Sequence, residues 1–156
     1  MDKLVPIVID SREQTPWHFE EHQAIVRIDT LRTGDYAVAG DFGFAVERKS
    51  LSDFLGTIST GWARFCKEIA RAKEAQFPNF PIVVEGTFST CCFHDECGVL
   101  VPPQHDHNKL LPAFIVKRIA ELTNMGCSVI FADNPEYASA IGFAILKERF
   151  EAINKD

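Results

Sequence analysis

The stretch that decides the fold is Gly34-Asp35-Tyr36, followed after a short connection by Val46-Glu47-Arg48-Lys49-Ser50. The apolar and β-branched residues around Val46 predict a strand, in which residues two positions apart point to the same side. Glu47 and Lys49 should therefore share one face of this strand, while Arg48 points to the other. A second short strand is expected to open at Asp35.

A turn at Gly40-Asp41 would join these two strands as a hairpin and carry Asp35 back beside Glu47. Two carboxylates and the amine of Lys49 would then meet at a strand end. Mg²⁺ and Mn²⁺ prefer such oxygen donors, and a divalent ion beside an ammonium suits phosphodiester hydrolysis. The alternative is a surface hairpin with exposed charges that contribute little to stability.

Length and composition indicate an ordinary globular protein. The 156 residues suffice for one domain with its own core, and 46% apolar with 24% charged residues is typical of such a domain. No signal pattern opens the sequence and no apolar run reaches membrane-spanning length. Five cysteines without framework spacing fit a reducing compartment. We therefore expect no membrane association, and a cytoplasmic location in a prokaryote or phage host or a nuclear one in a eukaryote.

The formal net charge of −6 argues against a protein that coats nucleic acid non-specifically, because phosphate neutralisation supplies most of that affinity. It does not exclude a nuclease. Acidic metal ligands lower the total charge, and a local basic stripe can still contact a DNA backbone.

The order of predicted elements indicates an α/β domain with a central mixed sheet and helices on both faces. Strands are expected at residues 4–9, 24–28, 36–39, 44–47, 82–85 and 127–131. Helices are expected just after Ser50, a good N-cap, and at residues 62–75, 110–125 and 135–153.

Residues 87–108 form the least regular stretch of the sequence and are expected to be a long loop. Its cysteines and histidines suggest a zinc site: Cys91, Cys92, His94, Cys97, His105 and His107. Structural zinc sites usually carry paired ligands on each arm, and this spacing is irregular. A polar loop with buried cysteines is therefore favoured over zinc.

Several motifs together resemble the nuclease domain of XPF-type structure-specific endonucleases, a branch of the restriction-endonuclease-like superfamily. The residues that carry the resemblance are Asp10-Ser11-Arg12-Glu13, Gly34-Asp35-Tyr36, Val46-Glu47-Arg48-Lys49-Ser50 with Asp53-Phe54, Arg64, and Val84-Glu85-Gly86. The likeness spans about residues 5 to 150. It implies a restriction-endonuclease-like fold and Mg²⁺- or Mn²⁺-dependent cleavage of branched, forked or flapped DNA.

The resemblance also implies roles for individual residues. Asp35 and Glu47 would bind the metal, and Lys49 would position or activate the attacking water. Asp10 and Glu13 would lie beside them as accessory acids, with Asp10 a further metal ligand. In the alternative, Asp10 and Glu13 simply cap the turn after the first strand.

Arg48 would brace the site or touch a phosphate, and Glu85 would either join the site or serve as a structural partner of Arg48 or Lys49. The residues expected to contact DNA are Arg12, Arg64, Lys67 and Arg71. The resemblance also turns Arg64 and Glu68 of the helix at 62–75 toward the cleft. The alternative for the three helical cations is a solvated helix face.

Residues 1–156 are predicted to be a single nuclease domain, without the helix-hairpin-helix or helicase modules of typical members. A separate DNA-gripping or helicase partner is therefore expected. A homodimer through the C-terminal helices is also expected, because the last helix carries apolar residues on more than one face. Other functions left open are a catalytically silent DNA-binding or scaffolding subunit and a nuclease that cuts by sequence.

Overall fold

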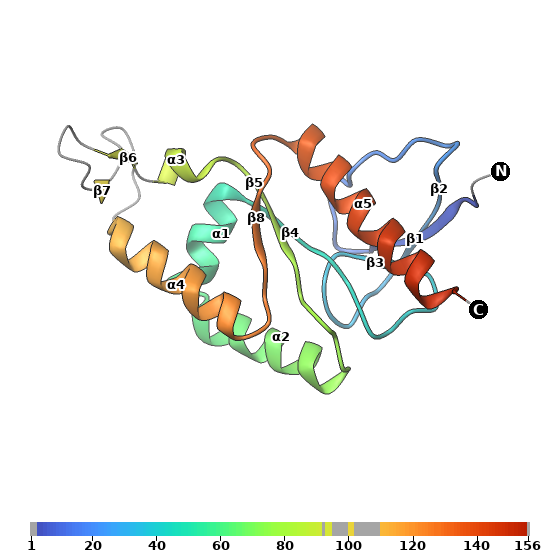
Figure 1. The fold of residues 1–156 in the computed structure, drawn as a ribbon, viewed down its shortest axis with the longest axis horizontal. Helices are drawn as coiled ribbons and strands as arrows, with labels where there is room; N and C mark the ends of the chain where they lie inside the picture. Colours follow the sequence, from blue (N-terminus) through green and yellow to red (C-terminus); the bar gives the residue numbers. More distant parts are fainter. Residues whose placement is uncertain (1–2, 92, 95–99, 102–109, 156) are drawn as a thin grey trace.

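The computed structural model describes residues 3–91, 93–94, 100–101 and 110–155. The strands are β1 (Val5–Asp10), β2 (Ala24–Asp29), β3 (Tyr36–Val38), β4 (Glu47–Ser50), β5 (Ile82–Glu85), β6 (Phe93–His94), β7 (Leu100–Val101) and β8 (Val129–Phe131). The helices are α1 (Leu51–Ile58), α2 (Trp62–Glu74), α3 (Phe88–Cys91), α4 (Pro112–Asn124) and α5 (Pro135–Ile153). Figure 1 shows their arrangement.

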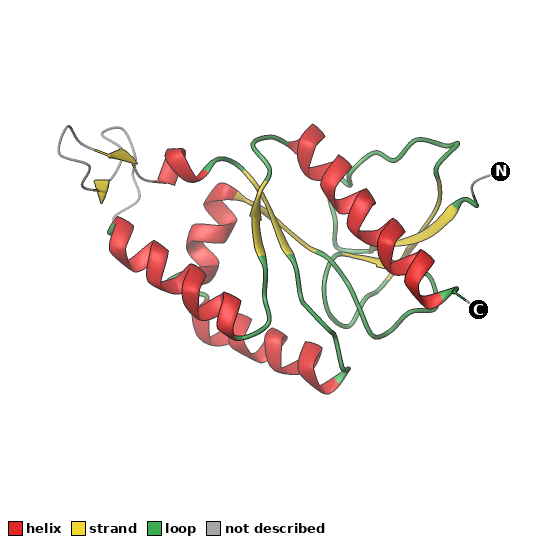
Figure 2. Cartoon of the chain, viewed as in Figure 1, coloured by secondary structure: helices red, strands yellow, loops and turns green. Residues whose placement is uncertain are grey.

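The sheet is mixed and consists of two three-stranded halves, ordered β2-β1-β3 and β4-β5-β8. In the first half β1 runs parallel to β2 and antiparallel to β3, and in the second half all neighbours are parallel. A single antiparallel bridge between Tyr36 and Val46 joins the halves. The predicted α/β architecture with a mixed sheet is confirmed (Figure 2).

Helices cover both faces of the sheet, and alternate residues of β5 therefore pack in different cores. Val83 packs in the core formed by β1, β3 and α5. Ile82 and Val84, which point the other way, pack in the core that contains residues of α1, α2 and α4. Figure 1 shows α5 set apart from these three helices. The prediction of helices on both faces is therefore also confirmed.

Two local predictions are wrong. The strand expected at residues 44–47 begins only at Glu47, and in place of a tight hairpin the chain makes a wide connection over residues 39–45. Asp41 holds this connection, because its carboxylate accepts hydrogen bonds from the Gly43 N–H at 3.0 Å and from Arg149 Nε at 2.7 Å. The apolar character of Phe44 reflects burial in the core and not strand pairing.

The expected loop over residues 87–108 contains the helix α3 and the antiparallel pair β6–β7. Of the suggested zinc ligands, Cys91 is buried in the core. The others named for that site are Cys92, Cys97, His105 and His107, which lie outside the described residues, and His94, whose side chain is not described.

Most of the apolar surface of α5 packs within the same chain. Ala138 and Leu146 are buried, and Ile141, Phe143, Ile145 and Phe150 pack against the same core. Gly142 allows the backbone of α5 to pack closely against the ring of Trp17, because a Cβ at this position would lie 2.3 Å from that ring. None of the helices in the described part of the chain is long and apolar enough to cross a membrane.

Candidate active site

The glycine of Gly34-Asp35-Tyr36 brings Asp35 to the centre of the sheet. Gly34 has φ +83, and a Cβ there would lie 2.5 Å from the Cβ of Ala45. Only glycine meets both conditions without strain. The close approach lets the N–H of Asp35 donate to Val46 O at 2.9 Å. The Asp35 carboxylate then accepts a 2.8 Å hydrogen bond from the N–H of Arg48.

Glu47 opens β4, and its side chain is 6% exposed. Its Oε1 lies 3.6 Å from Lys49 Nζ, so the two side chains share one face of the strand as predicted. Its Oε2 is buried and has no hydrogen-bond partner among the described residues. A buried carboxylate oxygen without a partner is costly. This atom therefore marks a place where a proton or a cation is needed.

The electrostatics of the two carboxyl groups support the same conclusion. Burial raises the pKa of Asp35 to about 6. Burial also raises the pKa of Glu47 well above its usual range, and the carboxylates of Asp35 and Glu68 raise it further. Lys49 opposes both shifts without cancelling them. When ionised, Asp35 and Glu47 therefore repel each other and Glu68, and a bound proton or cation would relieve this repulsion.

In the absence of metal, the protein should become more stable as the pH falls from about 7 toward 5. The pKa of Asp35 is about 6 in the folded chain against a usual 3.8, so the folded state binds more protons than the unfolded state in this window. The stabilisation is complete below 3.8, the pKa of Asp35 in the unfolded chain. It is lost as the pH rises through about 6, the pKa of Asp35 in the folded chain. Urea unfolding in EDTA at several pH values measures it.

The variant Asp35→Asn isolates this effect, because an amide does not titrate. Its stability relative to wild type should increase steadily from pH 5 to pH 7.5. A difference that stays constant across this range would show that Asp35 has an ordinary pKa and is not enclosed as described.

Arg48 points to the opposite side of β4 and organises a second network. Its guanidinium pairs with Glu85 through Nε and with Glu13 Oε2 at 3.1 Å through Nη1. Nη1 also donates to Thr15 O at 2.6 Å, and Tyr36 OH donates to Glu13 Oε2 at 2.8 Å. The structure therefore places Arg48 as a brace, and Glu85 is its structural partner.

Trp17 completes this network, although none of the sequence motifs includes it. Its ring stacks on Tyr36 with centroids 4.4 Å apart, and its Nε1 donates to Glu85 at 3.3 Å. The guanidinium of Arg48 lies 5.4 Å from the same ring. The chain before β2 is thereby fixed to β4 through one aromatic and ionic cluster.

Asp10 and Glu13 have other partners. Both oxygens of Asp10 contact Arg12, at 2.8 and 3.2 Å, and Oδ1 also accepts from the N–H of Leu31 at 2.9 Å. Burial alone would raise the pKa of Asp10, but these hydrogen bonds outweigh it and the net pKa is lowered. In the described part of the chain no three His, Cys, Asp or Glu side chains are grouped to hold a metal ion. The structure thus brings together Asp35 and Glu47, with Glu68 nearby, and carboxylates of this kind bind Mg²⁺ with water completing the shell.

The cations predicted to contact DNA lie on and around α2. Arg64 lines a cavity of about 370 Å³ together with Lys49 and Glu68. Lys67 is exposed on the same helix, and Arg71 lies further along it and lines a second cavity. Arg64 and Glu68 of α2 therefore lie at the same cavity as Lys49. Arg12, whose side chain is largely exposed, is held by Asp10.

Comparisons with known proteins agree with this arrangement. The model of the ERCC4 domain matches residues 9–141, which include the whole candidate site. Nineteen chains of known structure match, among them XPF from Aeropyrum pernix, with a TM-score of 0.66 and 20% sequence identity. The match covers 93% of this chain and 65% of that one, so this chain spans less than two thirds of the archaeal chain. No curated protein matches the sequence.

The structural likeness, at this level of identity, shows a common fold. The family match covers most of the chain and confirms the resemblance drawn from the motifs. The chain belongs to the ERCC4 domain family, the family of XPF-type nuclease domains.

Proposed function

We propose that the protein is a Mg²⁺- or Mn²⁺-dependent endonuclease that hydrolyses phosphodiester bonds in branched, forked or flapped DNA. The observation that carries this proposal is the buried Oε2 of Glu47, which has no partner among the described residues and lies beside Asp35 and Lys49. Membership of the ERCC4 domain family supports the reaction class.

Asp35 and Glu47 would hold the metal ion. When bound, a divalent ion supplies Lewis-acid stabilisation of the scissile phosphate and makes the attacking water more acidic. The N–H of Arg48 fixes one oxygen of Asp35 at 2.8 Å, so this carboxylate is oriented before the substrate binds. Asp10 is the weaker candidate ligand, because the guanidinium of Arg12 contacts both its oxygens and already neutralises its charge.

Lys49 would place its ammonium next to the phosphate on which negative charge develops, and would help to position the water. In-line attack of water on phosphorus breaks the bond to O3′. The attacking water loses a proton to solvent and its oxygen stays on the 5′-phosphate, while the leaving O3′ takes a proton and becomes a 3′-hydroxyl. Arg48 stays on the other face of β4 and keeps the strand in place.

The basic residues of α2 would hold the DNA backbone. Arg64 lines the same cavity as Lys49, Arg71 lines the second cavity further along the helix, and Lys67 is exposed between them. Phosphate contacts of this kind give affinity without reading sequence. A positive surface confined to one helix is also compatible with a formal net charge of −6.

A homodimer through the C-terminal helices remains part of the proposal, together with a separate DNA-gripping or helicase partner. What supports the dimer is the apolar surface that α4 and α5 leave exposed. Val116 is 41% exposed on α4, and Tyr137 and Ile153 on α5 are 59% and 46% exposed. Sedimentation at several protein concentrations tests this part of the proposal.

Cleavage of fork, flap, four-way junction and linear duplex substrates tests the proposed function. With Mn²⁺ we expect cuts near the branch point, and none in EDTA. Absence of cleavage on every substrate would favour a silent scaffolding subunit. Discrete cuts at one sequence of the linear duplex would favour a sequence-specific nuclease. Cleavage in EDTA would contradict the role of the metal.

A further inference from the structure

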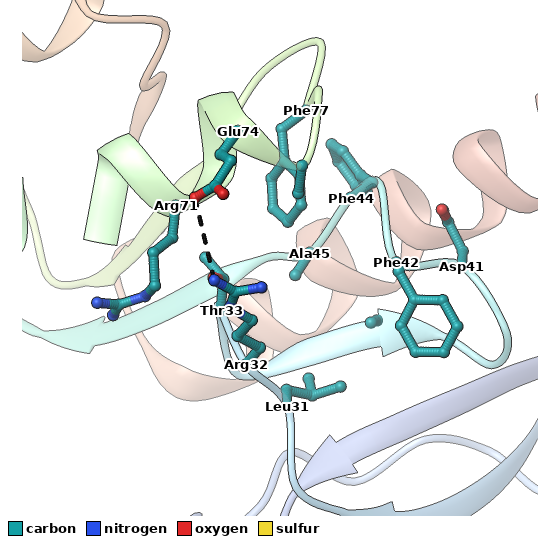
Figure 3. Close-up of a pocket in the computed structure, with 12 residues that line it drawn as sticks. Leu31, Arg32, Thr33, Asp41, Phe42, Phe44, Ala45, Arg71, Glu74 and Phe77 are labelled. Carbon is teal, nitrogen blue, oxygen red and sulfur yellow. Dashed lines mark ion pairs between the residues drawn. The ribbon is translucent and has the colours of Figure 1, made fainter. Parts of the chain in front are cut away.

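A second cavity of about 370 Å³ lies between the connection over residues 39–45 and the C-terminal end of α2 (Figure 3). Three aromatic and two cationic side chains line it, together with aliphatic, hydroxyl and acidic residues. The residues important here are Phe42, Phe44, Phe77, Arg32, Arg71 and Glu74. Its size lies within the roughly 300–1,000 Å³ of small-ligand pockets.

The walls of this cavity are continuous with the elements of the active site. Thr33 lines it, two residues before Asp35, and Ala45 lines it, two residues before Glu47. On α2, Arg71 lies one turn beyond Glu68. Because Glu68 lines the cavity beside Lys49, the same helix borders both cavities. A DNA strand that followed α2 from the active site toward the C-terminal end of the helix would reach this second cavity.

Phe42 is the ring of this wall that is open for stacking, because Phe44 is buried in the core. Phe42 is 87% exposed, although an aromatic ring gains from burial. Phe44 and Phe77 lie with ring centroids 6.2 Å apart. Figure 3 shows Phe77 between Phe44 and Glu74 and above Arg32, with Phe42 at one side of the cavity and Arg71 at the other.

The charges around the cavity leave a positive excess. Asp41 is neutralised by Arg149 at 2.7 Å. Arg32 and Glu74 lie 4.0 Å apart with side chains 79% and 75% exposed, and such surface pairs contribute little. Arg71 has no ion pair among the described residues. A ligand with a flat apolar part and a negative part would satisfy both kinds of wall.

We propose that this cavity binds an unpaired nucleotide of the DNA substrate, with its base on Phe42 and its phosphate at Arg71 and Arg32. The inference rests on the proposed DNA substrate and adds a contact that distinguishes branched DNA from plain duplex. Bases stack on exposed aromatic side chains regardless of sequence, and arginine adds a charged contact to the phosphate. A second copy of the chain would use the apolar rings but leave the arginines unsatisfied.

Anisotropy measurements with labelled DNA and the full chain test this inference without metal, in a Glu47→Gln background that removes cleavage. Phe42→Ala should weaken binding of a fork with an unpaired arm roughly 5- to 150-fold, the effect of losing one base stack. Binding of a blunt duplex should change less than twofold. Phe42→Trp should keep fork binding, and Ile28→Ala, an exposed apolar residue on the edge strand β2, should leave both unchanged.

Arg71→Ala should weaken fork binding. It should also reduce the slope of log K against log salt concentration by about 1, as expected for the loss of one phosphate contact. Lys117→Ala on the exposed side of α4 should do neither. Equal fork binding by wild type and Phe42→Ala would overturn the inference. So would a change of sedimentation mass in Phe42→Ala with unchanged DNA binding, which would make this a protein interface. If fork binding depends on Phe42 but the wild-type protein cuts no DNA, the proposed function is wrong. The assignment of the cavity would still stand in that case.

Discussion

Replacing Glu47 by glutamine should abolish DNA cleavage while the protein stays folded and still binds DNA. The amide keeps the shape of the side chain but loses the negative charge that would hold the metal with Asp35. Metal stabilisation of a phosphoryl transition state is worth several kcal/mol, and each 1.4 kcal/mol is tenfold in rate. We therefore expect at least about a 1,000-fold loss of cleavage, measured on a fork in Mn²⁺.

Misfolding would not explain this loss. Burial and neighbouring carboxylates raise the pKa of Glu47, so the folded chain already favours a neutral group at this position. The metal-free variant should be at least as stable as wild type in urea. The control is Glu148→Gln, the same chemical change at an exposed position on α5, which should cut normally. A Glu47→Gln protein that cuts at a tenth of the wild-type rate or faster would remove the catalytic assignment.

Replacing Arg48 by alanine should give the largest loss of stability. The guanidinium is 18% exposed and lies between Glu13 and Glu85, whose side chains are 17% and 9% exposed. Removing it leaves two largely buried carboxylates without their ion pair and removes the donor to Thr15 O. Breaking a buried pair typically costs 3–5 kcal/mol, and the partial exposure here favours about 3 kcal/mol. Urea unfolding at pH 7 measures the change.

The matched control is Arg27→Ala, an exposed arginine on the edge strand β2, with an expected change within about 0.5 kcal/mol. Arg48→Ala should also lower cleavage, since β4 carries Glu47 and Lys49. Arg48→Lys should recover part of the stability but not the forked contact to two carboxylates. A loss below about 1 kcal/mol in Arg48→Ala would show that this network does not brace the strand.

Local signals predicted much of the fold and the centre of the site. β5 has the predicted bounds, and Ser50 caps α1 through a 3.1 Å hydrogen bond from the N–H of Asp53. Asn134 caps α5 in the same way, at 2.8 Å from the N–H of Tyr137. Strand periodicity correctly put Glu47 and Lys49 on one face. These features depend on residues within a few positions of one another.

Features that depend on distant residues were not predictable from the sequence. In the sequence, Asp10 and Glu13 look like acids available to a metal site. In the structure, their carboxylates form ion pairs with Arg12 and Arg48. The expected hairpin failed because Asp41 is held by Arg149, far along the chain on α5. The place of Trp17 depends on Gly142, also on that helix. None of these pairings leaves a local pattern.

The central claim is that Asp35 and Glu47 share one divalent ion, and Mn²⁺ soaked into crystals tests it most directly. An anomalous difference map should show a peak in contact with one oxygen of each carboxylate. Crystals of Glu47→Gln soaked in the same way should lose this peak. A wild-type map with no peak between the two side chains, or with the ion bound to Asp10 instead, would contradict the account.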